Sequence, residues 1–255
     1  MRFATLASGS SGNATLVVHG DHAVMIDCGL SLRQAEARAQ ALGFSLADLD
    51  AVLVTHEHDD HLGGAGAVAR KYRVPVWSTA GTRLAGAARL GVTADCRDIL
   101  PGVSFRIGAF ELLPVIVPHD AREPCQFVLA AGGTRLGILT DVGQSTSHLL
   151  ASYAGLDALL LEFNHDPELL RRGPYPPALQ ARVGGDYGHL SNGQAEDILT
   201  RLDQGRLRYL TAAHLSEKNN TPGHVEACLE RALASGVRRH LASQGEPSPW
   251  FDLED

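Results

Sequence analysis

The sequence predicts an α/β fold that forms a single domain over residues 1–255. Three observations favour this prediction. Short β-type runs alternate with helical runs along most of the chain. The composition, with 44% hydrophobic and 20% charged residues, is that of a globular protein, and 255 residues suffice for one substantial core. No repeat, low-complexity tract or linker divides the chain.

The first third of the chain is expected to alternate strands with helices. A helix is expected over 31–43, because Ser31 can cap its N-terminus and Gly43 can end it. The run AVLVT at 51–55 is continuously apolar, as in a fully buried strand, and it leads directly into HEHDDH. The other expected elements are strands at 2–7, 14–19, 23–28 and 75–79, a helix that follows HEHDDH to about residue 73, and a helix near 81–90.

The rest of the chain is first β-rich and then alternating again. Between 171 and 188, Pro and Gly are too dense for one regular element, so a loop or broken helix on the substrate side is expected there. The other expected elements are strands in SFRIG, AFELLPVIV, QFVLAA and TRLGILTD between 103 and 141, strands at 157–163 and 208–214, and helices at about 192–202 and 222–234.

Charge and cysteine usage narrow the class of protein. The net charge of −7 gives no global basic footprint for nucleic acid or an anionic membrane, although two bound cations would reverse the sign inside a site. The four cysteines include no C-x-x-C pair, so neither a disulfide framework nor a Cys-rich zinc site is expected. No signal peptide or membrane span is expected either. The expected location is the cytoplasm, with no obligate protein partner.

The motif HEHDDH at 56–61 predicts a metal site. His56 and His58 leave a strand two residues apart, and in extended geometry this spacing puts both imidazoles on one side. Asp60 and His61 follow where the next helix begins. Two imidazoles that face one point, with a carboxylate and a third imidazole displaced by a turn, suit two neighbouring divalent ions better than one.

A two-metal site needs more ligands, and three candidates recur where an apolar strand ends. They are His119 in VIVPHD, Asp141 in GILTDVG and His214 in YLTAAHLS. Functional residues of open α/β sheets gather beyond the strand ends, so this joint placement favours a shared site. Imidazole with carboxylate suits Zn²⁺, Mn²⁺ or Fe²⁺, and the sequence leaves the choice of metal open.

In this order the motifs resemble the metallo-β-lactamase superfamily over essentially the whole chain. The resemblance implies a four-layer αββα sandwich with two metal ions at one edge. By this resemblance, one ion would bind His56, His58 and His119, and a second would bind Asp60, His61 and His214. Asp141 would bridge the two ions, and Asp27 would orient the ligands.

Longer local matches resemble the WalJ/YycJ branch, which is related to the ribonuclease Z group. These matches are LASGSSGNAT, DCGLS, VTHEHDDH, PHDA, ILTDVG, LEFNHDPELLRRGPYP, GHLSNGQA and AHLSEKNNTP. The branch implies a 5′-to-3′ DNA exonuclease, and therefore DNA as the favoured partner. The order Glu162, His189, His214 also resembles ribonuclease Z, which implies an acid–base dyad of Glu162 and His189. No insertion resembles the tRNA-clamping arm of ribonuclease Z, so tight, extended binding of a large RNA is not expected.

These residues predict a phosphodiesterase mechanism. Two divalent ions about 3.5–4 Å apart can share one bridging hydroxide and lower its pKa. The leaving alkoxide needs a proton, and Glu162 would orient His189, whose imidazolium would donate it for a gain of about 10²–10⁴ in rate. The predicted catalytic residues are therefore Asp60, Glu162 and His189.

Several polar residues are candidates for substrate contacts. The loop SGSSGN at 8–13 fits either a hairpin turn or a nest of backbone N–H groups for a phosphate, with Ser10, Ser11 and Asn13 as candidates. The basic candidates for phosphate contacts, which otherwise form a solvated surface, are Arg171, Arg172, Arg182 and Lys218.

Other functions stay open at this stage. A glyoxalase II-type thioester or lactone hydrolase, or a small-phosphodiester hydrolase, would share the metal ligands, and the thioester reaction does not require the pair Glu162–His189. A metal-stabilised binding module would need no open metal position, so the complete ligand set argues against it.

Overall fold

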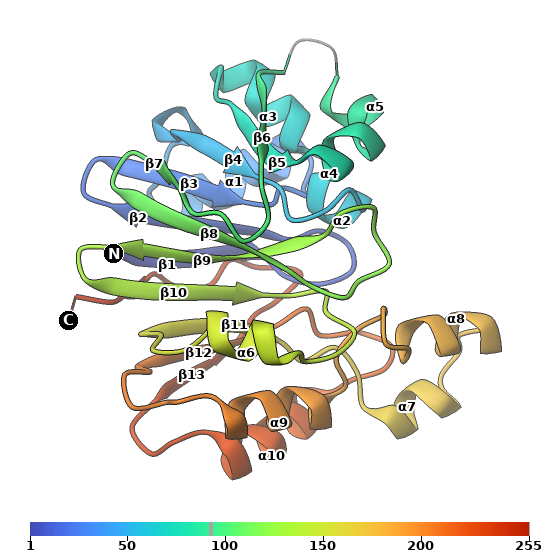
Figure 1. Ribbon diagram of the computed structural model, residues 1–255. Helices are drawn as coiled ribbons and strands as arrows, with labels where there is room; N and C mark the ends of the chain where they lie inside the picture. Colours follow the sequence, from blue (N-terminus) through green and yellow to red (C-terminus); the bar gives the residue numbers. More distant parts are fainter. Residues whose placement is uncertain (92–93, 255) are drawn as a thin grey trace.

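Two seven-stranded sheets pack face to face, and helices cover the outer face of each (Figure 1). This computed structural model describes residues 1–91 and 94–254. The first sheet has the order β14 (Phe251–Asp252), β1 (Arg2–Ala7), β2 (Ala14–His19), β3 (His22–Ile26), β4 (Ala51–Leu53), β5 (Val76–Thr79) and β6 (Cys96–Ile99). The second has the order β13 (Arg238–Leu241), β12 (Tyr209–Ala213), β11 (Ala158–Glu162), β10 (Thr134–Leu139), β9 (Cys125–Ala131), β8 (Phe110–Ile116) and β7 (Phe105–Ile107). The predicted αββα sandwich is confirmed.

Three apolar layers hold the sandwich together. Side chains such as Phe3 and Phe127 fill the layer between the sheets. Outside the first sheet lie α1 (Leu32–Ala41), the 3₁₀ turn η1 (Leu46–Asp48), α2 (Asp59–Leu62), α3 (Ala65–Tyr72), α4 (Ala80–Ala85) and α5 (Ala87–Leu90). Outside the second lie α6 (Ser147–Ser152), α9 (Asn192–Arg201) and α10 (Pro222–Ala232). Assignment of all 255 residues to one domain stays a prediction.

The expected elements form, with informative differences. The helix expected near 81–90 is split at Gly86, where an added Cβ would lie 2.6 Å from Leu62 Cδ1. The Pro/Gly-rich region at 171–188 is a broken helix, which contains the end of α7 (Pro167–Arg172) and the whole of α8 (Pro177–Val183). The helix α6, most of α7 and the strands β6, β13 and β14 were not predicted. These strands lie at or beside sheet edges, where polar and charged residues such as Arg97 replace the apolar pattern.

Parallel strands bring the predicted site residues to one edge of the sandwich. In the first sheet β3 to β6 run parallel, and in the second β10 to β13 do. Parallel neighbours end at the same side of a sheet, so the segments after β3, β4, β10, β11 and β12 meet. No helix in the described part of the chain is long and apolar enough to cross a membrane.

The turn after β3 and the loop between β1 and β2 both pack backbone to backbone against HEHDDH. In the turn, the amide of Cys28 donates to His61 O at 2.7 Å, and in the loop the amide of Asn13 donates to Asp60 O at 2.7 Å. An added Cβ at Gly29 would lie 1.9 Å from Asp60 O, which is far inside van der Waals contact. Only glycine therefore allows this turn to support Asp60 so closely.

Gly29→Ala should lower the free energy of unfolding by about 1–3 kcal/mol, because a backbone atom must move to admit the methyl group. The expected fall in melting temperature is several degrees, measured by thermal unfolding. Gly193→Ala is the matched control, because an added Cβ there meets nothing within 4 Å and the residue lies in a helix. Equal melting temperatures for the two variants would contradict the close packing.

Candidate metal centre

Three of the predicted site residues have strained backbones. Asp27, Asp141 and His214 follow β3, β10 and β12, and their φ angles are 58°, 53° and 54°. Among the non-glycine residues that the structure describes, the one other with positive φ is Arg73. Such conformations cost on the order of 1–3 kcal/mol each and tend to cluster at functional sites. Here they turn three polar side chains into one buried cluster.

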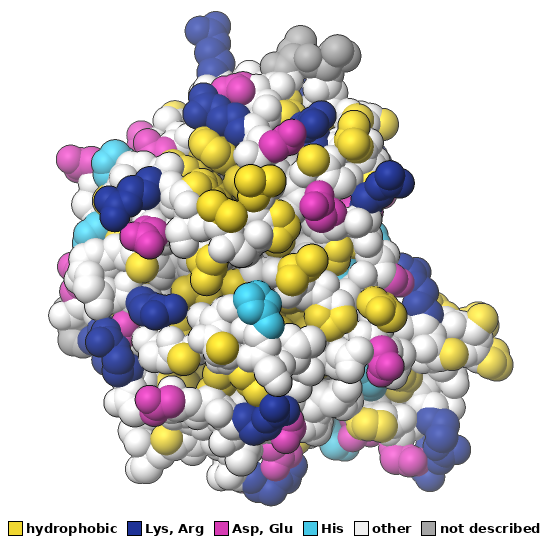
Figure 2. Space-filling model, viewed as in Figure 1, with side chains coloured by type: hydrophobic (Ala, Val, Ile, Leu, Met, Phe, Trp, Pro, Cys, Tyr) yellow, Lys and Arg dark blue, Asp and Glu magenta, His cyan; other side chains and the backbone are white. Residues whose placement is uncertain are grey.

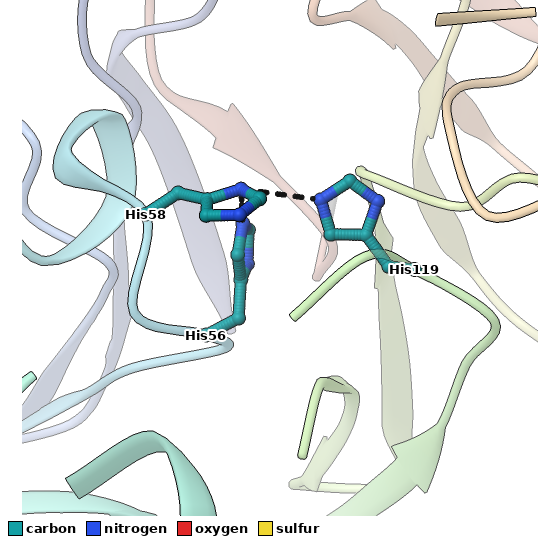
Figure 3. A group of neighbouring side chains, drawn as sticks. All are labelled: His56, His58 and His119. Carbon is teal, nitrogen blue, oxygen red and sulfur yellow. Dashed lines mark hydrogen bonds between the residues drawn. The ribbon is translucent and has the colours of Figure 1, made fainter. Parts of the chain in front are cut away.

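The first group of ring nitrogens belongs to His56, His58 and His119 (Figure 3). His58 Nδ1 lies 3.1 Å from His56 Nε2 and 3.4 Å from His119 Nε2. His56 and His58 come from the segment after β4, whereas His119 comes from the loop after β8 on the other sheet. Three converging imidazole nitrogens, with no carboxylate in their group, could hold a metal ion.

The second group consists of Asp60, His61 and His214. Asp60 Oδ2 lies 3.4 Å from both His61 Nε2 and His214 Nε2. Asp141 stands between the two groups. Its Oδ2 is 2.8 Å from His61 Nε2, and its Oδ1 is 3.6 Å from His214 Nε2 and 3.9 Å from His119 Nε2. This position would suit a carboxylate shared by two ions.

The donor set fits divalent cations. Asp141 Oδ2 is buried and accepts no hydrogen bond from the described residues, although His61 Nε2 lies 2.8 Å away. A buried carboxylate oxygen without a partner is unfavourable, and a cation removes that cost. Imidazole nitrogens and carboxylate oxygens are ligands that Zn²⁺, Mn²⁺ and Fe²⁺ accept.

The second ring nitrogen of each imidazole faces a protein oxygen. Such partners fix the tautomer and orientation of a metal-binding histidine. Asp27 is held in turn by Thr55, whose amide donates to Asp27 Oδ1 at 2.8 Å. The pairs are His61 Nδ1 with Asp27 Oδ2 at 2.8 Å, His56 Nδ1 with Thr55 Oγ1 at 3.0 Å, His119 Nδ1 with Gly188 O at 3.0 Å, His214 Nδ1 with Glu162 Oε1 at 3.2 Å, and His58 Nε2 with Asp120 Oδ1 at 3.9 Å.

Glu162 and His189 form a pair beside the cluster. Glu162 is fully buried, and its Oε1 accepts from His189 Nδ1 at 2.8 Å. Burial by itself raises the pKa of Glu162, but the charges and hydrogen bonds of His189 and His214 outweigh it and lower the pKa to about 2. Burial lowers the pKa of His189, yet Glu162 and Asp141 more than compensate, so this pKa is raised. The pair therefore favours a protonated imidazole.

The SGSSGN loop contacts the cluster mainly through Asn13. Its Nδ2 lies 3.1 Å from His61 Nε2 and 3.3 Å from Asp60 Oδ2, and its side chain is 6% exposed. Five N–H groups of the loop are already bonded within the protein, which fits the hairpin-turn interpretation better than a phosphate nest. They are Ser8 N to Ser243 O, Gly9 N to Asn13 Oδ1, Ser11 N to Gln244 Oε1, Gly12 N to Gly9 O and Asn13 N to Asp60 O.

A cavity of about 350 Å³ opens onto the cluster. Of the candidate substrate contacts, Ser10 and Arg182 line it, whereas Ser11, Arg171, Arg172 and Lys218 do not. Arg171 and Arg172 both pair with Glu168 on α7. The lining residues are Ser10, His58, Asp59, Asp60, Asp120, Asp141, Tyr175, Leu179, Arg182, Val183, Gly188, His189 and His214.

Sequence reasoning missed three polar residues that support the cluster. Thr55 and Asp120 are direct sequence neighbours of His56 and His119, and this adjacency was the available signal. Asn164 Nδ2 lies 3.2 Å from His214 Nδ1 across fifty positions, and no local pattern indicates that contact.

Comparisons with known proteins agree with this geometry. The family profile described as "Metallo-beta-lactamase superfamily" matches residues 7–214. "Exodeoxyribonuclease YycJ" of Bacillus anthracis is 33% identical over 222 residues, which are 86% of this chain and 84% of the relative. "Exodeoxyribonuclease WalJ" of Streptococcus pneumoniae is 32% identical over 223 residues, which are 86% of this chain and 83% of the relative. The crystal structure of the metallo-beta-lactamase fold protein YhfI from Bacillus subtilis aligns with a TM-score of 0.73 at 16% identity. The alignment covers 97% of this chain and 98% of the YhfI chain.

Asp27→Asn should weaken the binding of the ion next to His61 by about 10–100-fold, because a neutral amide oxygen accepts from Nδ1–H more weakly than a carboxylate and no longer supports the ring with a negative charge. Competition with a chromophoric chelator measures this affinity. Asp157→Asn is the control, since Asp157 is also buried but pairs with Arg206 away from the cluster. That variant should lose stability and keep its ion affinity. Equal ion affinities in the two variants would contradict the orienting role of Asp27.

Proposed function

The chain belongs to the metallo-beta-lactamase superfamily, and we propose that it is a two-metal nuclease that removes nucleotides from the 5′ end of DNA. As a member with an intact cluster it is a metal-dependent hydrolase. The observation that carries the nuclease proposal is the contact of 2.8 Å between Glu162 Oε1 and His189 Nδ1, directly beside that cluster. The exodeoxyribonuclease names of the two long matches support DNA as the substrate.

The proposed ligand assignment follows the two groups of donor atoms. His56, His58 and His119 would hold one ion, and the group Asp60, His61 and His214 would hold the second. Asp141 lies between the two groups and would serve as a shared carboxylate. When bound, two such ions lower the pKa of an attacking water and offset the negative charge of a phosphodiester. Zn²⁺ and Mn²⁺ are the favoured metals, with Fe²⁺ also compatible with these donors.

His189 acts as the general acid in this proposal. Glu162 holds Nδ1, so Nε2 of the protonated ring is free to donate toward the cavity that His189 lines. The proton goes to the 3′ oxygen of the departing nucleotide as its bond to phosphorus breaks, and the phosphate stays on the shortened strand. Such help is worth about 10²–10⁴ in rate for a poor alkoxide leaving group. A thiolate leaving group needs no proton from a general acid. The presence of the pair Glu162–His189 therefore favours a phosphodiester over a thioester substrate.

Figure 2 shows Lys and Arg side chains interspersed with Asp and Glu on the face in view. That face has no broad basic area of the kind that binds a duplex backbone. The four cysteines are free, which is compatible with the cytoplasmic location that we propose.

The wild-type protein, loaded with Mn²⁺ or Zn²⁺, should progressively shorten a 3′-labelled strand from the 5′ end of a duplex that carries a 5′-phosphate. His189→Ala should lower the rate by about 10²–10⁴ while both ions are retained. Asp60→Ala should abolish activity and release an ion, because it removes a carboxylate of the second group. Gel analysis measures the rate, and elemental analysis measures the metal content.

His148→Ala is the control for loss of a histidine, since His148 is exposed on α6 and should leave the rate unchanged. A duplex that stays intact under both metals would refute the DNA exonuclease. RNA, small phosphodiesters and thioesters are the substrates to try in that case. Equal loss of activity and metal in His189→Ala would refute the general-acid role.

A further inference from the structure

The helix α8 and Tyr175, two residues before it, form one wall of the cavity. Within the helix, Leu179 is three and four positions from Arg182 and Val183, so these three lining residues lie on one face. No residue of α8 is buried, and α7 and α8 stand beside the sandwich in Figure 1. This face of α8 therefore lines the cavity and does not pack into the core.

Arg182 is oriented by an acidic residue that touches the histidine cluster. Its Nε donates to Asp120 Oδ2, while Asp120 Oδ1 lies 3.5 Å from His119 Nε2. One carboxylate thus separates the guanidinium from the first group of histidines. Among the described residues Nε is the one guanidinium nitrogen of Arg182 with a hydrogen-bond partner, and the side chain is 59% exposed. Its two terminal nitrogens can therefore form a bidentate pair with a phosphate.

The other side chains on this face are apolar. Tyr175, Leu179 and Val183 are each half-buried against the cavity. Aromatic and apolar side chains of this kind bind nucleobases by stacking and contact. The volume of about 350 Å³ is near the lower end of the range for small-molecule pockets, about 300–1,000 Å³, so it suits one nucleotide and excludes a duplex.

Backbone contacts fix this wall relative to His189. The amide of His189 donates to Val183 O at 2.8 Å. An added Cβ at Gly188 would lie 2.2 Å from Arg182 O, so the segment between α8 and His189 is closely packed. The distance between Arg182 and His189, which both line the cavity, is consequently fixed by the backbone.

We propose that this wall is the subsite for the terminal nucleotide of a DNA strand, where Arg182 binds the 5′-phosphate and the apolar side chains contact the nucleoside. The inference rests on the proposed function and names the chemical group that the enzyme recognises. Arg182 is the one Lys or Arg among the residues that line the cavity, so it is the side chain available for that phosphate. Each cleavage leaves a new 5′-phosphate, which the same subsite would accept in the next cycle.

The test measures binding rather than cleavage. Protein carrying His189→Ala, loaded with Mn²⁺, is titrated into short single-stranded DNA that has a 3′ fluorophore and either a 5′-phosphate or a 5′-hydroxyl. Fluorescence anisotropy should show at least about tenfold tighter binding of the phosphorylated strand. Adding Arg182→Met should remove most of this preference, and Arg182→Lys should restore only part, because an ammonium lacks the bidentate fork. Leu179→Gln should weaken binding of both strands.

Arg231→Met is the matched control, since Arg231 forms a similar exposed pair with Glu196 but lies outside this cavity, and it should keep the preference. Equal binding of the two strands by the parent protein would overturn the subsite. A preference that survives Arg182→Met would overturn it as well, since the metal ions would then hold the phosphate. If the subsite fails while the wild-type protein still degrades DNA, the proposed function stands. A phosphate preference without any cleavage by the wild-type protein would refute the proposed function alone.

Discussion

The structure depends on a buried carboxylate that is surrounded by imidazoles. Asp141 is 1% exposed, and ring nitrogens of His61, His119 and His214 lie within 3.9 Å of its oxygens. A charge in this position is tolerated only when opposite charge compensates it closely. Bound cations would provide that compensation, and the oxygens behind the rings would keep the ring nitrogens turned toward them.

The centre exists only where the two sheets meet. His56 and His61 follow strands of the first sheet, whereas Asp141 and His214 follow strands of the second. The apolar layer between the sheets therefore sets the relative position of the two halves of the ligand set. The left-handed backbones after β3, β10 and β12 add local strain that this packing must overcome. Core packing and site geometry are consequently coupled in this fold.

The structure brings together side chains that the sequence predicted as ligands, because they follow apolar strands. Each of His56, Asp141 and His214 comes directly after a buried run, so the strand pattern locates the residue and the sheet topology brings the ends together. The substrate side was harder to predict. Arg171 and Arg182 look alike in the sequence, yet α7 directs the first toward Glu168 and α8 directs the second into the cavity.

That difference depends on where the helix breaks and on the rotation of each half. The segment between α7 and α8 sets both, and no periodic pattern records them. The pair Arg182–Asp120 spans 62 positions and joins α8 to the His119 loop, so no local sequence pattern predicts it either. The edge strand β6 escaped prediction for a different reason, because an edge strand exposes one side and needs no apolar alternation.

The charge of the cavity links metal binding to nucleic-acid binding. Four carboxylates line it, from Asp59, Asp60, Asp120 and Asp141, against the single guanidinium of Arg182. In a protein of net charge −7, this lining by itself repels a phosphodiester. In the proposed function, two divalent ions would add four positive charges at the base of the cavity and reverse the local sign. By thermodynamic linkage, a DNA end that bound the loaded site more tightly would strengthen ion binding by the same factor. Metal ions and substrate would then stabilise each other, and Arg182 would contribute the part of that attraction which is specific for a strand end.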